Sequence, residues 1–172
     1  IDSTTTLKIG SLEYDATYKY AFPGYISEVE IYKGVALHTT NFTPPTIPFP
    51  EPAPVDDTGK STTVVGNSIL QGTTKKYGTG AIYFDGTGDY LSVAHSGDLS
   101  LSNLDFTIEG WVYFNSVSGI QFILDSRGTT HDYACAYEIG LSGAGHTGKI
   151  QFAADTAAYN TNGSTWDVDL YS

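Results

Sequence analysis

The sequence has one cysteine, no methionine and few basic residues. The single cysteine, Cys135, cannot form a disulfide within the chain, so a disulfide-held scaffold is excluded. Its setting, YACAYEIG, predicts a buried, small apolar residue on a strand, with a reactive or intermolecular thiol as the alternative. No apolar run approaches the ~18 residues that a membrane-spanning helix needs. We therefore expect neither a disulfide framework nor a membrane partner.

Positive charge is also scarce. Eight Lys and Arg residues stand against 19 Asp and Glu residues, which gives a formal net charge of −11. Binding to a phosphate backbone needs clustered Lys and Arg, so nucleic acid is excluded as a partner. Acidic surfaces keep extracellular and virion proteins soluble, and their carboxylates can also supply oxygen ligands to Ca²⁺.

The residues that are abundant favour β-structure. There are 13 Tyr, eight Phe and 19 Gly residues, and aromatic side chains suit a pleated sheet whereas glycine suits tight turns. Short alternating runs bounded by Gly, Asn or Asp predict strands within residues 7–11, 25–32, 62–70, 80–86, 89–94, 105–115, 119–126, 133–140, 149–155 and 165–172. This rhythm predicts an all-β protein, an antiparallel β-sandwich of the Greek-key or jelly-roll kind.

Two stretches resemble a known family. FDGTGDYLSV at 84–93 and DLSLSNLDFTIEGWVYF at 98–114 resemble the first strands of the concanavalin A-like lectin/glucanase superfamily. The likeness is to its laminin G-like form, which recurs in marine phage fibre and virion proteins. FPGYISEVEIYKGVALHTTNFTPPTIPFP at 22–50 is similar to the end of such a module.

The order of these two stretches predicts the domain organisation. Residues 1–42 would be the C-terminal part of one laminin G-like module and residues 61–172 the N-terminal part of a second. Between them, residues 43–60 carry six of the seven prolines and are expected to form a semi-rigid linker. The alternative is one permuted or strand-donated sandwich. We expect the chain to be a window on a longer, multi-module protein.

The resemblance implies a location and a role. It places the chain outside the cell or on a virion surface, as a structural and interaction module that contacts itself or neighbouring virion or filament subunits. A lectin-like module that attaches to host or environmental polysaccharide is the alternative.

Carboxylates at alternate positions were considered as a catalytic pair. Glu28 and Glu30 share a face of an alternating strand, as do Asp167 and Asp169. Neither pair has the third acid that the glucanase motif places on the same strand, and both are explained as solvent-facing residues. We therefore expect no enzymatic activity and no catalytic residue.

A metal site is predicted in one turn. Asp85 and Asp89 bracket the glycine-rich DGTGD, where carboxylates and free carbonyls suit Ca²⁺. The alternative is that the two aspartates cap the turn by accepting N–H bonds. No cofactor is expected to be required, and the four scattered histidines show no zinc spacing.

Aromatic residues are the candidates for glycan binding, because rings stack on sugars and polar neighbours bind the hydroxyls. In DFTIEGWVYFN the apolar residues of one face are expected to be buried, whereas Trp111 and Tyr113 share the opposite face. Trp166 and Asn162, from a later segment, complete the predicted set. A structural module would bury such rings against its neighbours, whereas a lectin would leave them open.

Overall fold

The structure, a computed structural model, describes residues 6–13, 19–44, 46, 62–101, 104–127, 137–141, 148–154 and 168–171. Its strands are β1 (Leu7–Ile9), β2 (Ser11–Glu13), β3 (Lys19–Ala21), β4 (Pro23–Lys33), β5 (Thr62–Val65), β6 (Ile69–Gln71), β7 (Ala81–Asp85), β8 (Tyr90–Val93), β9 (Phe106–Phe114), β10 (Gln121–Asp125), β11 (Tyr137–Leu141), β12 (Ile150–Ala154) and β13 (Val168–Tyr171). The described residues contain one helical element, the 3₁₀ turn η1 (Gly97–Leu99). None of these residues therefore belongs to a helix long and apolar enough to cross a membrane.

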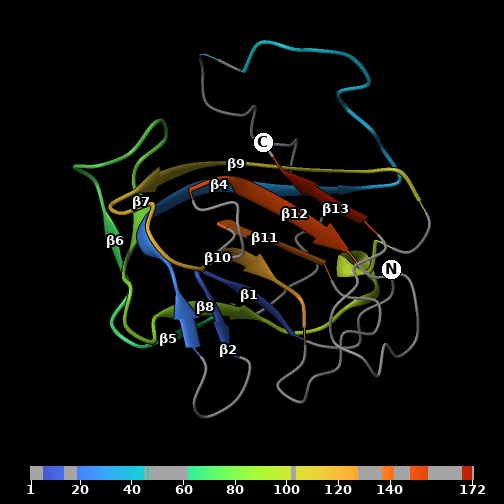
Figure 1. Cartoon of the computed structure of the whole chain (residues 1–172). Helices are drawn as coiled ribbons and strands as arrows, with labels where there is room; N and C mark the ends of the chain where they lie inside the picture. The colour runs from blue at the N-terminus through green and yellow to red at the C-terminus, as the bar shows by residue number, and fades with distance from the viewer. Residues whose placement is uncertain are drawn as a thin grey trace.

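Two antiparallel sheets form the body of the molecule (Figure 1). The larger sheet has the order β13-β12-β11-β10-β1-β8-β5, and the smaller has the order β6-β7-β4-β9. A separate pair, β2-β3, packs beside β10 through the rings of Tyr20 and Phe122, whose centroids lie 6.0 Å apart. The all-β, antiparallel prediction is confirmed.

Strands from the start of the chain lie inside both sheets. In the larger sheet β1 pairs with β10 on one side and with β8 on the other. In the smaller sheet β4 pairs with β7 and with β9. Strands β1 and β4 therefore share the two sheets with strands β5–β10. The assignment of the two segments to two laminin G-like modules stays a prediction.

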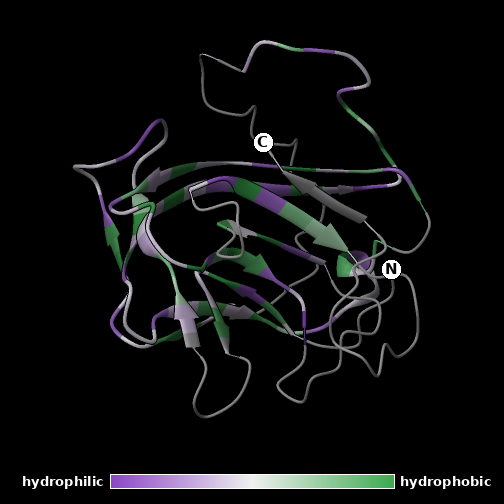
Figure 2. Cartoon of the chain, in the orientation of Figure 1, coloured by the Kyte–Doolittle hydropathy of each residue, from purple (hydrophilic) through white to green (hydrophobic). Residues whose placement is uncertain are grey.

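The core lies between the sheets. One cluster joins Phe22, Ile26 and Phe84, from the side of the smaller sheet, to Ile123 and Leu124 of β10. A second cluster, at the other end of the strands, consists of Leu7, Leu101, Tyr137 and Ala154. Hydrophobic and hydrophilic positions alternate along the strands around this core (Figure 2), as burial of one sheet face requires.

A β-bulge interrupts β4. The pairing of β4 with β9 shifts register between Ser27 and Glu30, and Glu28 has a φ of 51°. The bulge turns Val29 towards the core and leaves Glu30 opposite Glu109. Glu28 borders an inner hollow, whereas Glu30 accepts a bond from Tyr32. The regular alternation expected to put Glu28 and Glu30 on one face is therefore broken here.

Glycine splits two of the expected strands. Gly10 has a φ of +92° and ends the strand expected over 7–11, and a Cβ there would lie 2.5 Å from the ring of Phe84. Gly66, with a φ of +81°, lies in the turn that divides residues 62–70 into β5 and β6. These two strands belong to different sheets. At Gly66, a glycine with positive φ therefore lies in the turn where the chain passes from the larger sheet to the smaller one.

We expect a disulfide between β4 and β9 to form within one chain. Tyr32 and Thr107 are register partners, so Tyr32→Cys with Thr107→Cys, in a Cys135→Ser background, places two sulfurs within bonding reach. Oxidised protein should run as a monomer on a non-reducing gel. Tyr32→Cys with Thr63→Cys, in the other sheet, is the control and should stay reduced. Disulfide-linked dimers or ladders would instead mean that β4 is donated to a neighbouring copy.

Candidate functional site

A row of tyrosines crosses the outer face of the smaller sheet. Tyr83, Tyr25 and Tyr113 are register partners on β7, β4 and β9. The ring centroids of Tyr25 and Tyr83 lie 5.0 Å apart, and those of Tyr25 and Tyr113 lie 5.9 Å apart. The Tyr113 side chain is 59% exposed. Cross-strand stacking holds these rings in place and leaves an aromatic surface open to solvent.

The loop between β6 and β7 closes over Trp111. The Tyr77 ring meets the Trp111 ring edge-on, with centroids 5.4 Å apart. The Lys76 ammonium lies 5.5 Å from the centroid of Trp111 and 5.7 Å from that of Tyr77. Edge-on aromatic pairs and cations above ring faces are both favourable. The Trp111 side chain therefore lies between β9 and this loop.

Between the tyrosine row and the loop lies a hollow of about 140 Å³, which we call the aromatic pocket. Its lining residues come from β4, β9, the β6–β7 loop and the start of β7: Tyr25, Ser27, Thr74, Lys75, Lys76, Ala81, Trp111, Val112 and Tyr113. Rings, hydroxyls and ammonium groups thus converge on one small concavity. None of these described lining residues is acidic.

The structure brings together two of the four residues predicted to bind glycan. Trp111 and Tyr113 both line the aromatic pocket, and the opposite face of β9 packs on the core as expected. Trp166 and Asn162 lie outside the described residues. Sequence reasoning missed Tyr25 and the lysines of the β6–β7 loop, because only the pairing of distant strands brings them to Trp111.

The carboxylates considered for catalysis lie elsewhere. Glu30 accepts a hydrogen bond from the Tyr32 hydroxyl, and Glu109, its neighbour across the strands, lies 3.3 Å from the ring nitrogen of His38. The bond to Glu30, then burial and nearby negative charge, raises the pKa of Tyr32 to about 12. In β13 the backbone of Asp169 pairs with Ala153. Asp167 lies outside the described residues.

Asp85 and Asp89 accept hydrogen bonds from backbone groups of their own turn and of the β5–β6 turn. Asp89 is fully buried, and its two oxygens accept N–H bonds from Asn67 at 2.8 Å and Asp85 at 3.2 Å. Asp85 accepts the N–H of Thr87 at 2.6 Å. No group of three His, Cys, Asp or Glu side chains suited to a metal occurs among the described residues. The hydrogen bonds match the capping alternative, and calcium binding at this turn stays a prediction.

We expect chelation to leave stability unchanged. Because Asp85 and Asp89 already accept backbone N–H groups, these hydrogen bonds hold the turn without a metal ion. The melting temperature measured in excess EDTA should therefore equal that in millimolar Ca²⁺. A ligand that binds only the folded state must raise stability. A melting temperature that falls in EDTA, and no longer does so after Asp85→Asn, would establish the calcium site.

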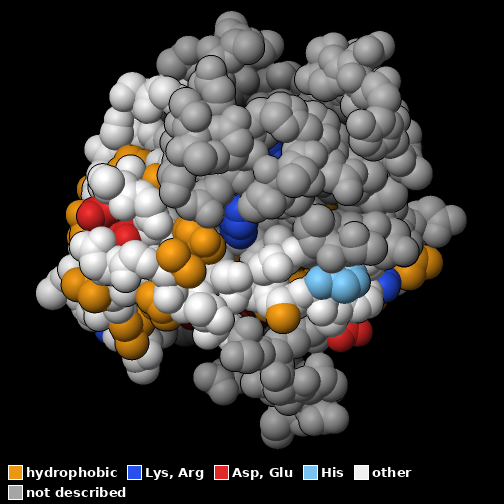
Figure 3. Space-filling model, turned by 90° about the horizontal axis from the view of Figure 1, so that it is seen from below, with side chains coloured by type: hydrophobic (Ala, Val, Ile, Leu, Met, Phe, Trp, Pro, Cys, Tyr) orange, Lys and Arg blue, Asp and Glu red, His pale blue; other side chains and the backbone are white. Residues whose placement is uncertain are grey.

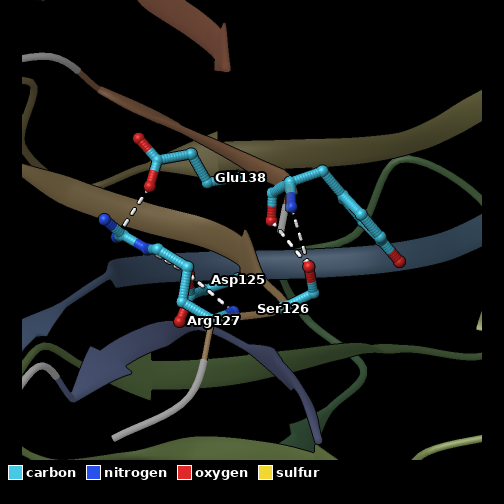
Figure 4. Close-up of polar contacts among 5 residues, drawn as sticks. Asp125, Ser126, Arg127 and Glu138 are labelled. Atoms are coloured by element: carbon cyan, nitrogen blue, oxygen red, sulfur yellow. Dashed lines mark hydrogen bonds and ion pairs between the residues drawn. The ribbon is translucent and has the colours of Figure 1, made fainter. Parts of the chain in front are cut away.

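A buried ion-pair cluster lies where β10 ends beside β11 (Figure 4). The Arg127 guanidinium donates a hydrogen bond from Nε to Asp125 at 2.8 Å, and its terminal nitrogen forms an ion pair with Glu138 at 2.6 Å. Asp125 is fully buried, and Arg127 and Glu138 are 8% and 4% exposed. Next to them, the Ser126 hydroxyl donates to the carbonyl of Tyr137 at 3.1 Å and accepts its N–H at 2.8 Å. These bonds tie the end of β10 to the start of β11.

Burial controls the ionisation of this cluster. It raises the pKa of Asp125 above its ordinary value of 3.8, although the charge and hydrogen bonds of Arg127 and the charge of Lys8 act in the opposite direction. Burial, with a smaller contribution from the negative charge of Asp125, raises the pKa of Tyr137 to about 12. The pairing of Asp125 with Arg127 was not predicted from the sequence.

The raised pKa of Asp125 predicts a pH dependence of stability. Between the unfolded and folded pKa values the folded chain keeps a proton that the unfolded chain releases, so this group's contribution falls as pH rises from about 3.8 and then levels off. The free energy of unfolding relative to an Asp125→Asn variant should fall over that range. A difference that instead grows with pH would show that Arg127 dominates the titration.

In comparisons with models of known protein families, with curated proteins and with solved structures, nothing matches this chain. The fold defines its class, an antiparallel β-sandwich. The resemblance to concanavalin A-like and laminin G-like modules stays a prediction.

Proposed function

We propose that this chain is a non-enzymatic β-sandwich module of a phage virion or extracellular fibre protein, and that its aromatic pocket binds a glycan. The observation that carries the glycan is the open row of rings on the outer face, where Tyr113 is 59% exposed beside Trp111. A sugar offers apolar C–H faces for stacking and hydroxyls for hydrogen bonds. Ser27, Thr74 and the lysines are placed to bind those hydroxyls.

The finer fold and the location belong to the same proposal. A jelly-roll arrangement of the concanavalin A-like, laminin G-like kind agrees with two facing antiparallel sheets and with the stretches at 22–50 and 84–114 that resemble those modules. Modules of that kind recur in fibre and virion proteins, which supports an extracellular or virion-surface location.

A second candidate role is structural contact between copies, and a separate surface favours it. The edge strands β5 and β6 carry Val64, Ile69 and Leu70, which are 58%, 51% and 68% exposed. Hydrophobic side chains also gather on the left of Figure 3, the side on which Figure 1 places β5 and β6. Exposed apolar edge strands favour association with another chain.

One pair of measurements separates the two roles. Binding to a panel of immobilised polysaccharides tests the glycan, and sedimentation at increasing protein concentration tests self-association. We expect at least one polysaccharide to retain the chain, and Tyr113→Ala to weaken that retention. If no glycan is bound and Leu70→Lys abolishes assembly, the role is structural and the glycan proposal fails.

A further inference from the structure

Two lysines of the β6–β7 loop lie at the aromatic pocket. Lys75 and Lys76 are both exposed and both line it. The Lys76 ammonium lies above Trp111, and the Lys75 ammonium donates to the carbonyl of Thr79 at 3.3 Å. Both cations are thus held on the rim of the pocket, next to the rings.

The positive charge at the aromatic pocket is opposite in sign to the net charge of the chain. The sequence has eight basic and 19 acidic residues and a net charge of −11. Of the basic residues, Lys8 and Arg127 are buried. Yet two lysines and no acidic residue occur among the described residues that line the aromatic pocket. A neutral sugar would not require that local excess of positive charge, whereas an anionic one would bind there against the repulsion of the rest of the surface.

We propose that the ligand of the aromatic pocket is an anionic glycan, whose negative groups bind Lys75 and Lys76 while its sugar rings stack on Tyr25, Trp111 and Tyr113. This inference rests on the proposed glycan-binding function. The anionic group is a carboxylate, as in a uronic acid, or a sulfate ester. Both accept charge-assisted hydrogen bonds from an ammonium group, and these are stronger than neutral ones.

Pairs of ligands with the same sugar backbone, one charged and one neutral, provide the test. Calorimetric titration compares oligogalacturonates with their methyl esters, and carrageenan oligosaccharides with their desulfated forms. In at least one pair, the anionic ligand should bind about tenfold or more tightly than its neutral counterpart, as expected for hydrogen bonds to charged groups. Which pair shows the preference identifies the carboxylate or the sulfate. Added salt should reduce the preference.

Charge variants assign the preference to the loop. Lys75→Gln with Lys76→Gln should bring the anionic ligand to the affinity of the neutral one, and Lys75→Arg with Lys76→Arg should keep most of the difference. Lys33→Gln with Lys149→Gln removes two exposed lysines that do not line the pocket and should change nothing. Near-ultraviolet circular dichroism confirms that each variant is folded.

The outcomes distinguish the two proposals. Equal affinity for charged and neutral ligands overturns the anionic ligand, and a preference that survives Lys75→Gln with Lys76→Gln overturns its binding by these two lysines. Either result leaves glycan binding in place. Failure of every charged and neutral oligosaccharide to bind overturns both.

Discussion

Replacing Arg127 by Met is expected to lower the free energy of unfolding by about 3–5 kcal/mol, the usual cost of removing one partner from a buried ion pair. The substitution leaves Asp125 and Glu138 without their shared cation, in a region where neither side chain is more than 5% exposed. The loss exceeds that of an ordinary surface change because water cannot replace the arginine. Urea denaturation at neutral pH measures it.

A charge-neutral variant tests the explanation. Combining Arg127→Met with Asp125→Asn and Glu138→Gln removes the uncompensated charges, so it should recover part of the stability that the single substitution loses. Lys149→Met, at an exposed site, should stay within about 0.5 kcal/mol of the parent. A loss below about 1 kcal/mol for Arg127→Met alone would show that the cluster is not buried as described.

The second large effect concerns binding. Trp111→Ala is expected to weaken glycan binding about 30-fold, which corresponds to about 2 kcal/mol for an aromatic residue central to a binding surface. The change removes the indole ring that contacts Tyr77 and Lys76 of the β6–β7 loop. Titration with the best ligand of the panel measures the dissociation constant.

Two further variants make this result specific. Because Trp111 is only partly exposed, Tyr113→Ala, at a 59% exposed position, provides a change that removes only the ring contact with Tyr25 and should also weaken binding. Phe42→Ala removes an aromatic side chain that is 53% exposed and does not line the aromatic pocket, so its affinity should equal the parent's. Equal losses for Phe42→Ala and Tyr113→Ala would place the ligand elsewhere.

Alternation in the sequence was sufficient to predict the faces of β9. Phe106, Ile108, Val112 and Phe114 pack on the core, and Trp111 and Tyr113 lie on the other side. The reason is physical, since successive side chains of a strand point to opposite faces and only one face can be buried. A local pattern therefore located two of the nine residues that line the aromatic pocket.

Contacts between residues of different strands could not be predicted from the local sequence pattern. Tyr25 meets Tyr113 because β4 pairs with β9, although about 90 residues separate them in the chain. The same holds for Arg127 and Glu138, which come from β10's end and from β11. Each of these contacts depends on the order of the strands in the sheet. The same alternation is compatible with several strand orders and registers.

The bulge shows why even a clear alternation can mislead. Residues 28–31, EVEI, alternate between polar and apolar, but the extra residue at Glu28 shifts all that follows by one position relative to β9. Glu28 has no feature, such as a glycine, that signals a positive φ. The spacing predicted a carboxylate pair within one strand, Glu28 and Glu30. In the structure Glu30 instead lies opposite Glu109 of the neighbouring strand.

The intrinsic fluorescence of Trp111 reports whether a glycan binds in the aromatic pocket. The signal can be assigned because the chain has only two tryptophans. In a Trp166→Phe variant all tryptophan emission comes from the aromatic pocket. Titration with the best-binding oligosaccharide should change the intensity or wavelength of that emission and saturate at the dissociation constant found by calorimetry. If calorimetry shows binding while the emission of Trp111 stays constant, the glycan binds elsewhere and the account is contradicted.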